Sequence, residues 1–419
     1  MAYCEKIFTD LNRLAVSPEG ERQLIRELAS KVAELARSPR MASIKKRWRD
    51  VMGLRKPDRP PVWCNPVGCW TELLPDSSLV CKNQTHRELE IYFKRLLIKN
   101  EIGDDTPVND YYTMNAIFDV YPSNVWGIDI ERENLNETGA AWKYKSALVS
   151  ESDFDRLVVP RYKMNLTATE AARAQLADIL GKSMPVRVSP INGYYSGGTI
   201  CNPAADLRGM EQIMMDMIES PELVHRLMKT VYMGEMSKLD AIEEAGNILP
   251  NTDGAMFLSD PLRENNSGIY GLKDCWIHGN SQEFDLISPD MFNEFLLEYQ
   301  KKIFARFGAT CYGCCENLTH KLDYVLTIPN LRLLTCSGWT DLLTLVNKSG
   351  NRHCIMWRHK ASDVVCPDDL ADLKKNIFFQ ADILKGCSYQ VVLRELQTLF
   401  GHPDRLREWT RISVEATSK

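Results

Sequence analysis

Two patterns of hydrophobic and polar residues alternate along the second half of the chain. Short apolar runs are separated by stretches in which apolar residues recur every three to four positions, the period of an amphipathic helix. In the stretch 289–306 the apolar residues share one helical face, and Ser288 before Pro289 is a candidate N-cap. We predict strands over the apolar runs Pro185–Val188, Ala255–Leu258, Cys275–His278, Ala309–Tyr312, Leu331–Cys336, Cys354–Trp357 and Tyr389–Leu393.

The first part of the chain has a different pattern. Apolar residues recur at helical spacing over 1–50, which predicts helices that pack on the surface or at a dimer interface. The segment Lys56–Pro61 contains three prolines and ends any helix, and the apolar Val62–Cys64 then has the pattern of a first strand. We therefore expect a helical extension over 1–50 and a main domain over 51–419, in a chain that can form a homodimer.

Strands and helices alternate from about residue 184 onward, which indicates a parallel sheet. The number of repeats favours closure, so we predict an α/β fold: a (β/α)8 TIM barrel with an N-terminal helical extension. The chain has 419 residues, more than the about 250 of a plain barrel, so additions are expected. One addition is a hairpin in which Trp126–Glu131 pairs with Ala141–Tyr144 through a turn at Asn134–Gly139.

Composition narrows the class of protein. The 51 basic and 56 acidic residues nearly balance and no basic run is long, which argues against nucleic-acid binding. No apolar stretch approaches the length of a membrane span, and the first residues lack a signal-peptide core, so we expect a cytoplasmic protein without a membrane partner. In that compartment the 13 cysteines are packed thiols, metal ligands or reactive groups, and their number suggests an anaerobe.

The segment Cys311–Glu316 is the strongest candidate for chemistry. It follows a predicted strand, and in barrels the carboxyl ends of the strands form the active site. On an extended backbone Cys314 and Cys315 would point to opposite sides, so one of them would face the barrel mouth. Two thiols and the Glu316 carboxylate are ligand types that zinc prefers. A packed thiol is the alternative for any single cysteine, and a core side chain is the alternative for His278.

Several strings resemble the uroporphyrinogen decarboxylase superfamily. They are Lys56–Trp63, Leu207–Glu211, Ser220–His225, Ser281–Glu283, Tyr312–Glu316, Leu331–Arg332 with Ser337, Trp339 and Asp341, Arg394–Thr398 and Pro403–Trp409. The resemblance covers about 45–415 and implies the barrel fold. True uroporphyrinogen decarboxylases hold a tetrapyrrole's carboxylates with two arginines, but Asn65 and Cys69 stand at those places here. The loss of two guanidinium groups argues against porphyrinogen decarboxylation.

The same resemblance implies corrinoid-dependent methyl transfer. Related methyltransferases carry a His-x-Cys-Gly-type zinc motif at this strand end and a later cysteine. Here Tyr312 or Gly313 replaces the histidine, and Cys314 or Cys315 takes the place of the cysteine. The resemblance implies zinc ligands among Cys314, Cys315, Cys387 and Glu283, and catalytic roles for Glu283, Glu316 and Tyr312.

The expected activity is zinc-dependent transfer of a methyl group between a small methoxylated or methylamine-type compound and a corrinoid (cobalamin) carried by a partner protein, with demethylation as the preferred direction. Zinc would act as a Lewis acid on the donor's heteroatom. The expected substrate contacts are Trp63, Asn65, Tyr194 and Trp339, although such aromatics often only pack. The alternatives are a decarboxylase acting on a smaller substrate and a non-catalytic barrel that binds a corrinoid or another ligand.

Overall fold

A parallel sheet of six strands forms one side of the molecule. The computed structural model describes residues 19–133, 143–191 and 193–418. The sheet has the order β1-β12-β11-β10-β9-β8, and each neighbouring pair is parallel. Its strands are β1 (Val62–Cys64), β8 (Trp276–Gly279), β9 (Ala309–Tyr312), β10 (Leu331–Cys336), β11 (Cys354–His359) and β12 (Ser388–Leu393).

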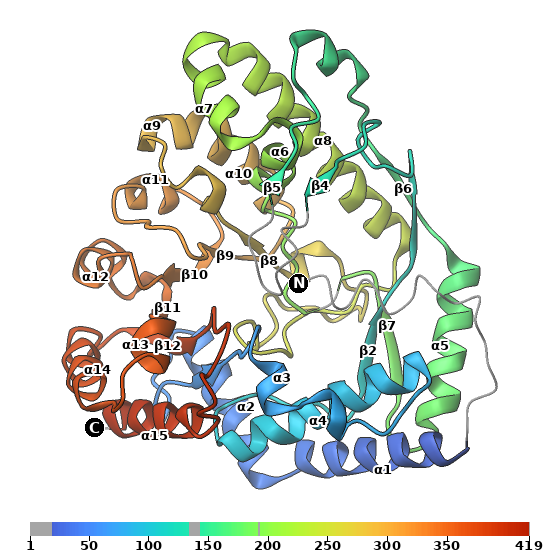
Figure 1. Ribbon diagram of the computed structural model, residues 1–419, viewed down its shortest axis with the longest axis vertical. Coiled ribbons are helices and arrows are strands. Elements are labelled where there is room, and N and C mark those ends of the chain that lie inside the picture. The colour runs from blue at the N-terminus through green and yellow to red at the C-terminus, as the bar shows by residue number, and fades with distance from the viewer. Residues whose placement is uncertain (1–18, 134–142, 192, 419) are drawn as a thin grey trace.

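A second parallel sheet consists of two strands. β2 (Tyr112–Asn115) pairs with β7 (Val186–Ser189), and the two sheets lie around a common centre with helices outside them (Figure 1). Within the described residues no strand ladder joins β1 to β2 or β7 to β8. Single contacts bridge the first gap, such as the Asp105 amide that donates to the Val62 carbonyl at 2.7 Å. The α/β class is confirmed, and the arrangement is compatible with a barrel.

Helices supply the crossovers that parallel strands need. The helices are α1 (Glu19–Ala36), α2 (Pro39–Met52), α3 (Trp70–Leu73), α4 (Gln84–Ile102), α5 (Leu166–Leu180), α6 (Cys201–Arg208), α7 (Met210–Glu219), α8 (Pro221–Ala245), α9 (Pro289–Phe292), α10 (Glu298–Phe304), α11 (Leu322–Val325), α12 (Leu342–Ser349), α13 (Ala361–Val365), α14 (Ala371–Ile383) and α15 (Arg405–Thr417). Short turns of 3-10 helix lie at Asp76–Ser78, Glu151–Arg156, Leu272–Asp274, Gln282–Phe284 and Gly350–Arg352.

Two small antiparallel pairs stand beside this frame. β3 (Phe118–Tyr121) pairs with β6 (Arg161–Met164), and β4 (Arg132–Glu133) pairs with β5 (Lys143–Tyr144). The second pair lies close to the predicted hairpin, but its first strand begins after Glu131. The predicted turn Asn134–Gly139 lies outside the described residues.

The helix predicted over 289–306 forms, with one departure from ideal geometry. Ser288 caps its start, since its side chain accepts a hydrogen bond from the Met291 amide. A turn of π-helix at Asn293–Leu297 then separates α9 from α10.

Two predicted strands are wrong: Trp126–Glu131 of the expected hairpin contains no strand residue, and neither does Ala255–Leu258. The run Ala255–Leu258 is a turn in which Met256, Phe257 and Leu258 are buried. Met256 has a φ of 69°, which a strand does not allow. The run is apolar because a loop packs into the core there, and a short apolar run alone cannot distinguish that case from a strand.

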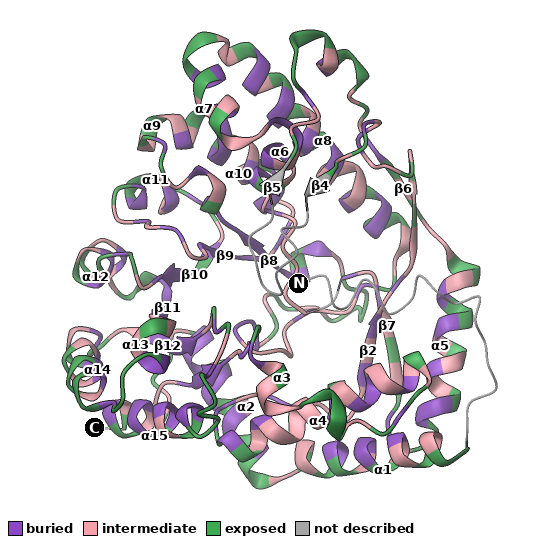
Figure 2. Ribbon diagram, viewed as in Figure 1, coloured by how far each residue is buried: buried purple, intermediate pink, exposed green. Residues whose placement is uncertain are grey.

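The strands of the six-stranded sheet are largely buried (Figure 2), and alternate strand residues belong to two different cores, as expected for a sheet buried on both sides. The outer face packs on the surrounding helices and includes Ile277, Tyr312, Ile355, Trp357 and Val391. The other face, here called the inner face, packs with Trp48 and Met52 of α2 and includes Trp63, Trp276, Cys311, Leu333, Met356 and Val392. Because α2 shares this inner core, it contributes to the main packing unit, and it continues past the expected boundary at residue 50.

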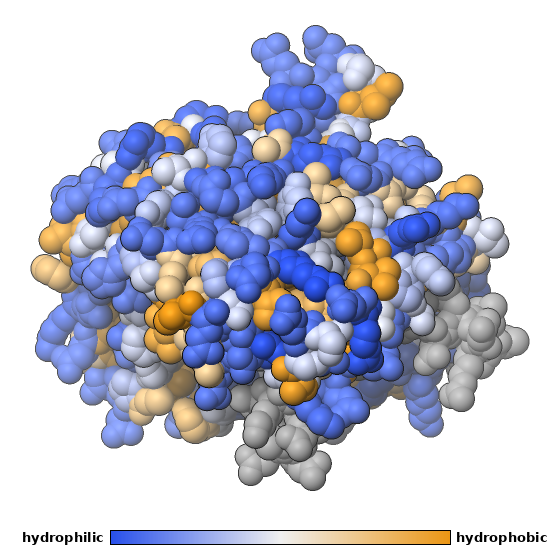
Figure 3. Space-filling model, turned by 90° about the horizontal axis from the view of Figure 1, so that it is seen from above, coloured by the Kyte–Doolittle hydropathy of each residue, from blue (hydrophilic) through white to orange (hydrophobic). Residues whose placement is uncertain are grey.

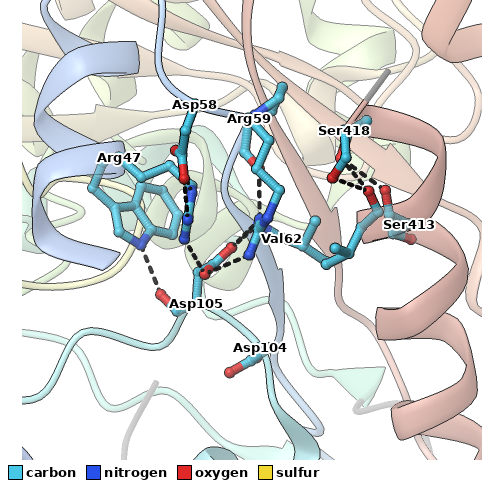
Figure 4. A network of polar contacts seen from close by, with 12 residues as sticks. Arg47, Asp58, Arg59, Val62, Asp104, Asp105, Ser413 and Ser418 are labelled. Carbon is cyan, nitrogen blue, oxygen red and sulfur yellow. Dashed lines mark hydrogen bonds and ion pairs between the residues drawn. The ribbon is translucent and has the colours of Figure 1, made fainter. Parts of the chain in front are cut away.

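A buried ion-pair network ties α2 to the sheet (Figure 4). The Asp105 carboxylate accepts from Arg47 Nη1 at 2.6 Å, from Arg59 Nη1 at 2.6 Å and from the Val62 amide at 2.8 Å. The Trp48 indole donates to the Asp105 carbonyl at 2.7 Å. Asp105 is only 2% exposed, so its charge depends on these partners.

The molecular surface is mixed. Hydrophilic residues cover most of the face seen in Figure 3, and hydrophobic residues form separate patches on it. Across the described part of the chain, no helix has both the length and the apolar character needed to cross a bilayer.

The substitution Asp105→Asn tests the importance of this network. It removes the carboxylate that the buried Arg47 shares with the half-buried Arg59 and leaves Arg47 only its pair with Asp58, so we expect a loss of about 3–5 kcal/mol in the free energy of unfolding, measured by chemical denaturation. Asp372→Asn is the control, because Asp372 forms a surface pair with Lys375 and should show no measurable change. Equal stability of the two variants would contradict the structural role of Asp105.

Candidate functional site

The candidate site lies at the carboxyl edge of the six-stranded sheet. Four of the six strands end in polar or reactive residues there: Asn280–Glu283 after β8, Gly313–Glu316 after β9, Arg358 near the end of β11, and Arg394 with Glu395 after β12. Parallel strands place these ends on the same side, so residues that are far apart in the sequence meet.

Glu316 holds two of these strand ends together. One carboxylate oxygen accepts from the Ser281 amide and the other from the Cys314 amide, both at 2.8 Å. Glu316 is 2% exposed, and both oxygens are engaged by the backbone. The geometry therefore gives Glu316 a positioning role on the loops after β8 and β9.

Cys314 and Cys315 lie on the same side of the chain. Their Sγ atoms are 3.6 Å apart, so the expectation that they point to opposite sides is wrong. The reason is that Gly313 has a φ of 103° and the chain bends after it. A side chain at this position would also meet Leu318 and Thr335 within 3 Å.

Arg358 supplies the positive charge beside the thiols. Its side chain is 1% exposed, and its Nη1 lies 3.0 Å from the Cys314 carbonyl and 3.8 Å from Cys314 Sγ. The same Nη1 donates to Glu395 Oε1 at 3.1 Å. Glu395 has a φ of 61°, a strained value for a residue other than glycine, and strain of this kind is concentrated at functional sites.

The two thiols have opposite acidities. The hydrogen bond from Cys315 and the charges of Arg358 and Arg394 lower the pKa of Cys314 to about 6, against the opposing effect of burial. The pKa of Cys315 is raised well above its ordinary value by its hydrogen bond to Cys314 and by burial. Near neutral pH the lowered pKa of Cys314 favours its thiolate form. Both residues are only half-buried.

Glu283 and Tyr312 are hydrogen-bonded to residues other than Cys314 and Cys315. Cys201 donates to Glu283 Oε2 at 3.2 Å, and burial raises the pKa of the Glu283 carboxyl. Tyr312 is fully buried on the outer face, where its hydroxyl donates to Gln300 Oε1 at 3.0 Å. The structure thus shows a packing role for Tyr312 and a thiol partner for Glu283.

The zinc ligand set expected from the sequence is not brought together. Cys387 comes directly before β12, whereas Cys314 and Cys315 follow β9, so parallel pairing places them at opposite edges of the sheet. Across the described ranges, no three His, Cys, Asp or Glu side chains converge in a way that could hold a metal ion. A ligand set that joins Cys387 to Cys314 or Cys315 is therefore wrong, the cation beside Cys314 is the Arg358 guanidinium, and zinc binding itself stays a prediction.

The expected substrate contacts divide into two groups. Trp63 and Tyr194 belong to the inner core, and Asn65 follows β1 at the carboxyl edge. Trp339 instead lies 65% exposed at the outer rim, with Lys360 Nζ 4.4 Å from its ring centroid. Trp339 lines a groove of about 680 Å³ that also includes residues of α12 and α14.

Sequence reasoning missed Arg358, Arg394 and Glu395 as site residues. The sequence did contain an indication of Arg358. It occupies the same alternating positions as Cys354 and Met356 in a mostly apolar strand, so its side chain lies on the same face as theirs. A charge at an inner-facing position near the end of a buried strand needs a partner. Nothing local in the sequence indicates that this partner is Cys314.

Comparisons with known proteins leave the family open. No family model matches the chain, and no curated protein matches it. Among solved structures, a methyltransferase from Methanosarcina mazei is similar at 15% identity and a TM-score of 0.49, over 89% of this chain and 98% of that one. A likeness of this extent says nothing about the chemistry of the site.

The acidity of Cys314 can be measured directly. Because its pKa is lowered to about 6, the thiolate is present above that value, and iodoacetamide labelling of Cys314 should rise through about pH 6. Labelling is followed by peptide mass spectrometry, with the exposed Cys366 as internal reference. Arg358→Met removes the neighbouring charge and should move the midpoint to higher pH. An unchanged midpoint in that variant would rule out Arg358 as a cause.

Proposed function

We propose that the chain is a methyltransferase that moves a methyl group between a small methylated compound and a corrinoid protein, on a closed (β/α)8 barrel. The observation that carries this proposal is the position of Cys314 at the carboxyl edge, with its Sγ 3.8 Å from Arg358 Nη1 and 3.6 Å from Cys315 Sγ, an environment that lowers the pKa of its thiol. A thiolate with a lowered pKa is an activated nucleophile.

Methyl transfer to Cys314 is a direct displacement. The thiolate attacks the methyl carbon, the S–CH3 bond forms, and the bond from the methyl group to its heteroatom breaks with its electron pair going to the heteroatom. The methylated sulfur of Cys314 accepts a hydrogen bond from Cys315 more weakly than the thiolate does. The Cys315 proton can then move to the leaving heteroatom. The two cysteines thus have different tasks, in agreement with their opposite acidities.

Release of the methyl group regenerates the thiolate. A corrinoid on the partner protein would supply the nucleophile that accepts the methyl group from sulfur, and Cys315 would regain its proton from solvent. Cys314 and Cys315 are half-buried at the carboxyl edge, which fits exchange with a separate protein. Arg358 stabilises the thiolate that is left behind, since its Nη1 lies 3.8 Å from Cys314 Sγ.

The proposed steps use no zinc, and metal analysis tests this point. We expect the same zinc content in the anaerobically purified protein and in the Cys314→Ala and Cys315→Ala variants. About one zinc per chain that is lost in these variants would overturn the metal-free form of the proposal and restore the thiolate–zinc alternative.

Methyl transfer itself is tested in two half-reactions. Without corrinoid, incubation with methoxylated and methylamine donors should add the mass of one methyl group to the Cys314 peptide. With reduced cobalamin added, methylcobalamin should form and be visible by its absorbance. Cys314→Ser should lower this rate by at least about 10³-fold, as expected when a nucleophile is removed.

The matched control is Cys387→Ser, at the opposite edge of the sheet. Its rate should stay within about twofold of the wild-type rate, because the residue is remote from Cys314. If no donor methylates Cys314 and no methylcobalamin forms, the proposed function is wrong.

A further inference from the structure

Two arginines present unpaired N–H groups to the inner face beside Cys314. Arg358 shares the inner-facing period of β11 with Cys354 and Met356. In the parallel register Val392 of β12 pairs with Arg358. Arg394 follows Val392 by two residues, the spacing at which strand side chains share a face. The two arginines therefore come from neighbouring strands on the same face, with Arg394 two residues further toward the carboxyl edge than the residue paired with Arg358.

Buried polar atoms without partners gather at this place. Arg358 Nη2, Arg394 Nε and Nη1, and the Tyr194 hydroxyl are buried and have no hydrogen-bond partner among the described residues. Arg358 is 1% exposed and Arg394 13%. Leaving such groups unpaired is costly, so four of them in one place indicate a site that a ligand completes.

The aromatic contacts show that these atoms belong to one cluster. The ring centroids of Tyr194 and His278 are 4.5 Å apart. Arg394 Cζ lies 5.7 Å from the centroid of the Tyr194 ring. Burial lowers the pKa of His278, and the charges of Arg358 and Arg394 lower it further. With its pKa at about 3, His278 is neutral and adds no charge to the cluster.

The anions already present do not satisfy these N–H groups. Glu395 is the one carboxylate within ion-pair distance of either arginine in the described part of the chain. It engages Nη1 of Arg358 at 3.1 Å and lies 3.9 Å from Arg394 Nε, beyond hydrogen-bond distance. The Cys314 thiolate is near the same Nη1, so Nη2 of Arg358 and the Arg394 nitrogens stay free.

We propose that Arg358, Arg394 and the Tyr194 hydroxyl form a binding site for a carboxylate, and that the methyl donor is a small organic acid with its methylated heteroatom close to that carboxylate. Guanidinium N–H groups match the two oxygens of a carboxylate in charge and geometry. Since Arg358 Nη1 lies 3.8 Å from Cys314 Sγ, the carboxylate and the methyl group of an acid that reacts there would be only a few bonds apart.

This inference names the substrate class of the proposed methyltransferase, and its test is binding, which needs no methyl transfer. The probes are methoxyacetate and ortho-methoxybenzoate, each compared with its neutral amide, titrated into the full-length protein by calorimetry. We expect at least one acid to bind at least about 10-fold more tightly than its amide, because a charged hydrogen bond is lost in the amide.

Three variants separate the site from a general effect of charge. Arg394→Gln should weaken acid binding by at least about 10-fold and leave amide binding unchanged. Tyr194→Phe removes only one hydroxyl and should weaken acid binding by a few-fold. Arg407→Gln, at an exposed arginine on α15, should have no effect. Thermal unfolding of each variant confirms that it folds.

Equal binding of acids and amides, absence of binding by both acids, or full acid binding by a folded Arg394→Gln protein would overturn the carboxylate site. The Cys314→Ser protein distinguishes this failure from failure of the proposed function. If that variant binds the acid while the wild-type protein transfers no methyl group, the carboxylate site stands and the methyltransferase does not.

Discussion

Parallel strands can be joined only by long crossovers, and this constraint shapes most of the molecule. Each crossover places a helix outside the sheet, so the strands are buried on both faces and become almost wholly apolar. Every strand also ends at the same edge. Polar groups that cannot be accommodated along the strands gather there, and Cys314, Arg358, Arg394 and Glu395 are brought together although they come from three strands.

Arg358 is the residue through which these groups interact. A buried guanidinium needs partners, and it finds the Cys314 carbonyl and the Glu395 carboxylate. The same charge contributes to the low pKa of the Cys314 thiol, so structural compensation of a buried charge also prepares a nucleophile. The nitrogen that remains unpaired, Nη2, is what makes the carboxylate site plausible on physical grounds.

Much of the fold could be predicted from the sequence because the information is local. The spans predicted for β9 and β10 agree with those observed, and Ser288 caps its helix as the pattern indicates. The strand β2 was not predicted, because its residues Tyr112–Asn115 alternate in burial and do not form an apolar run. The Ala255–Leu258 run failed for the opposite reason: it is apolar because it is a buried loop.

By itself the sequence determined the α/β class, most of the strands and the place of Cys314 and Cys315 after a strand, because period and turn residues act over a few neighbours. Only the tertiary structure decided which side chains meet. It moved Cys387 to the far edge, turned both thiols to one side through Gly313, and placed Arg358 against Cys314. Those outcomes depend on strand order and register, which arise from packing between residues that are remote in the chain.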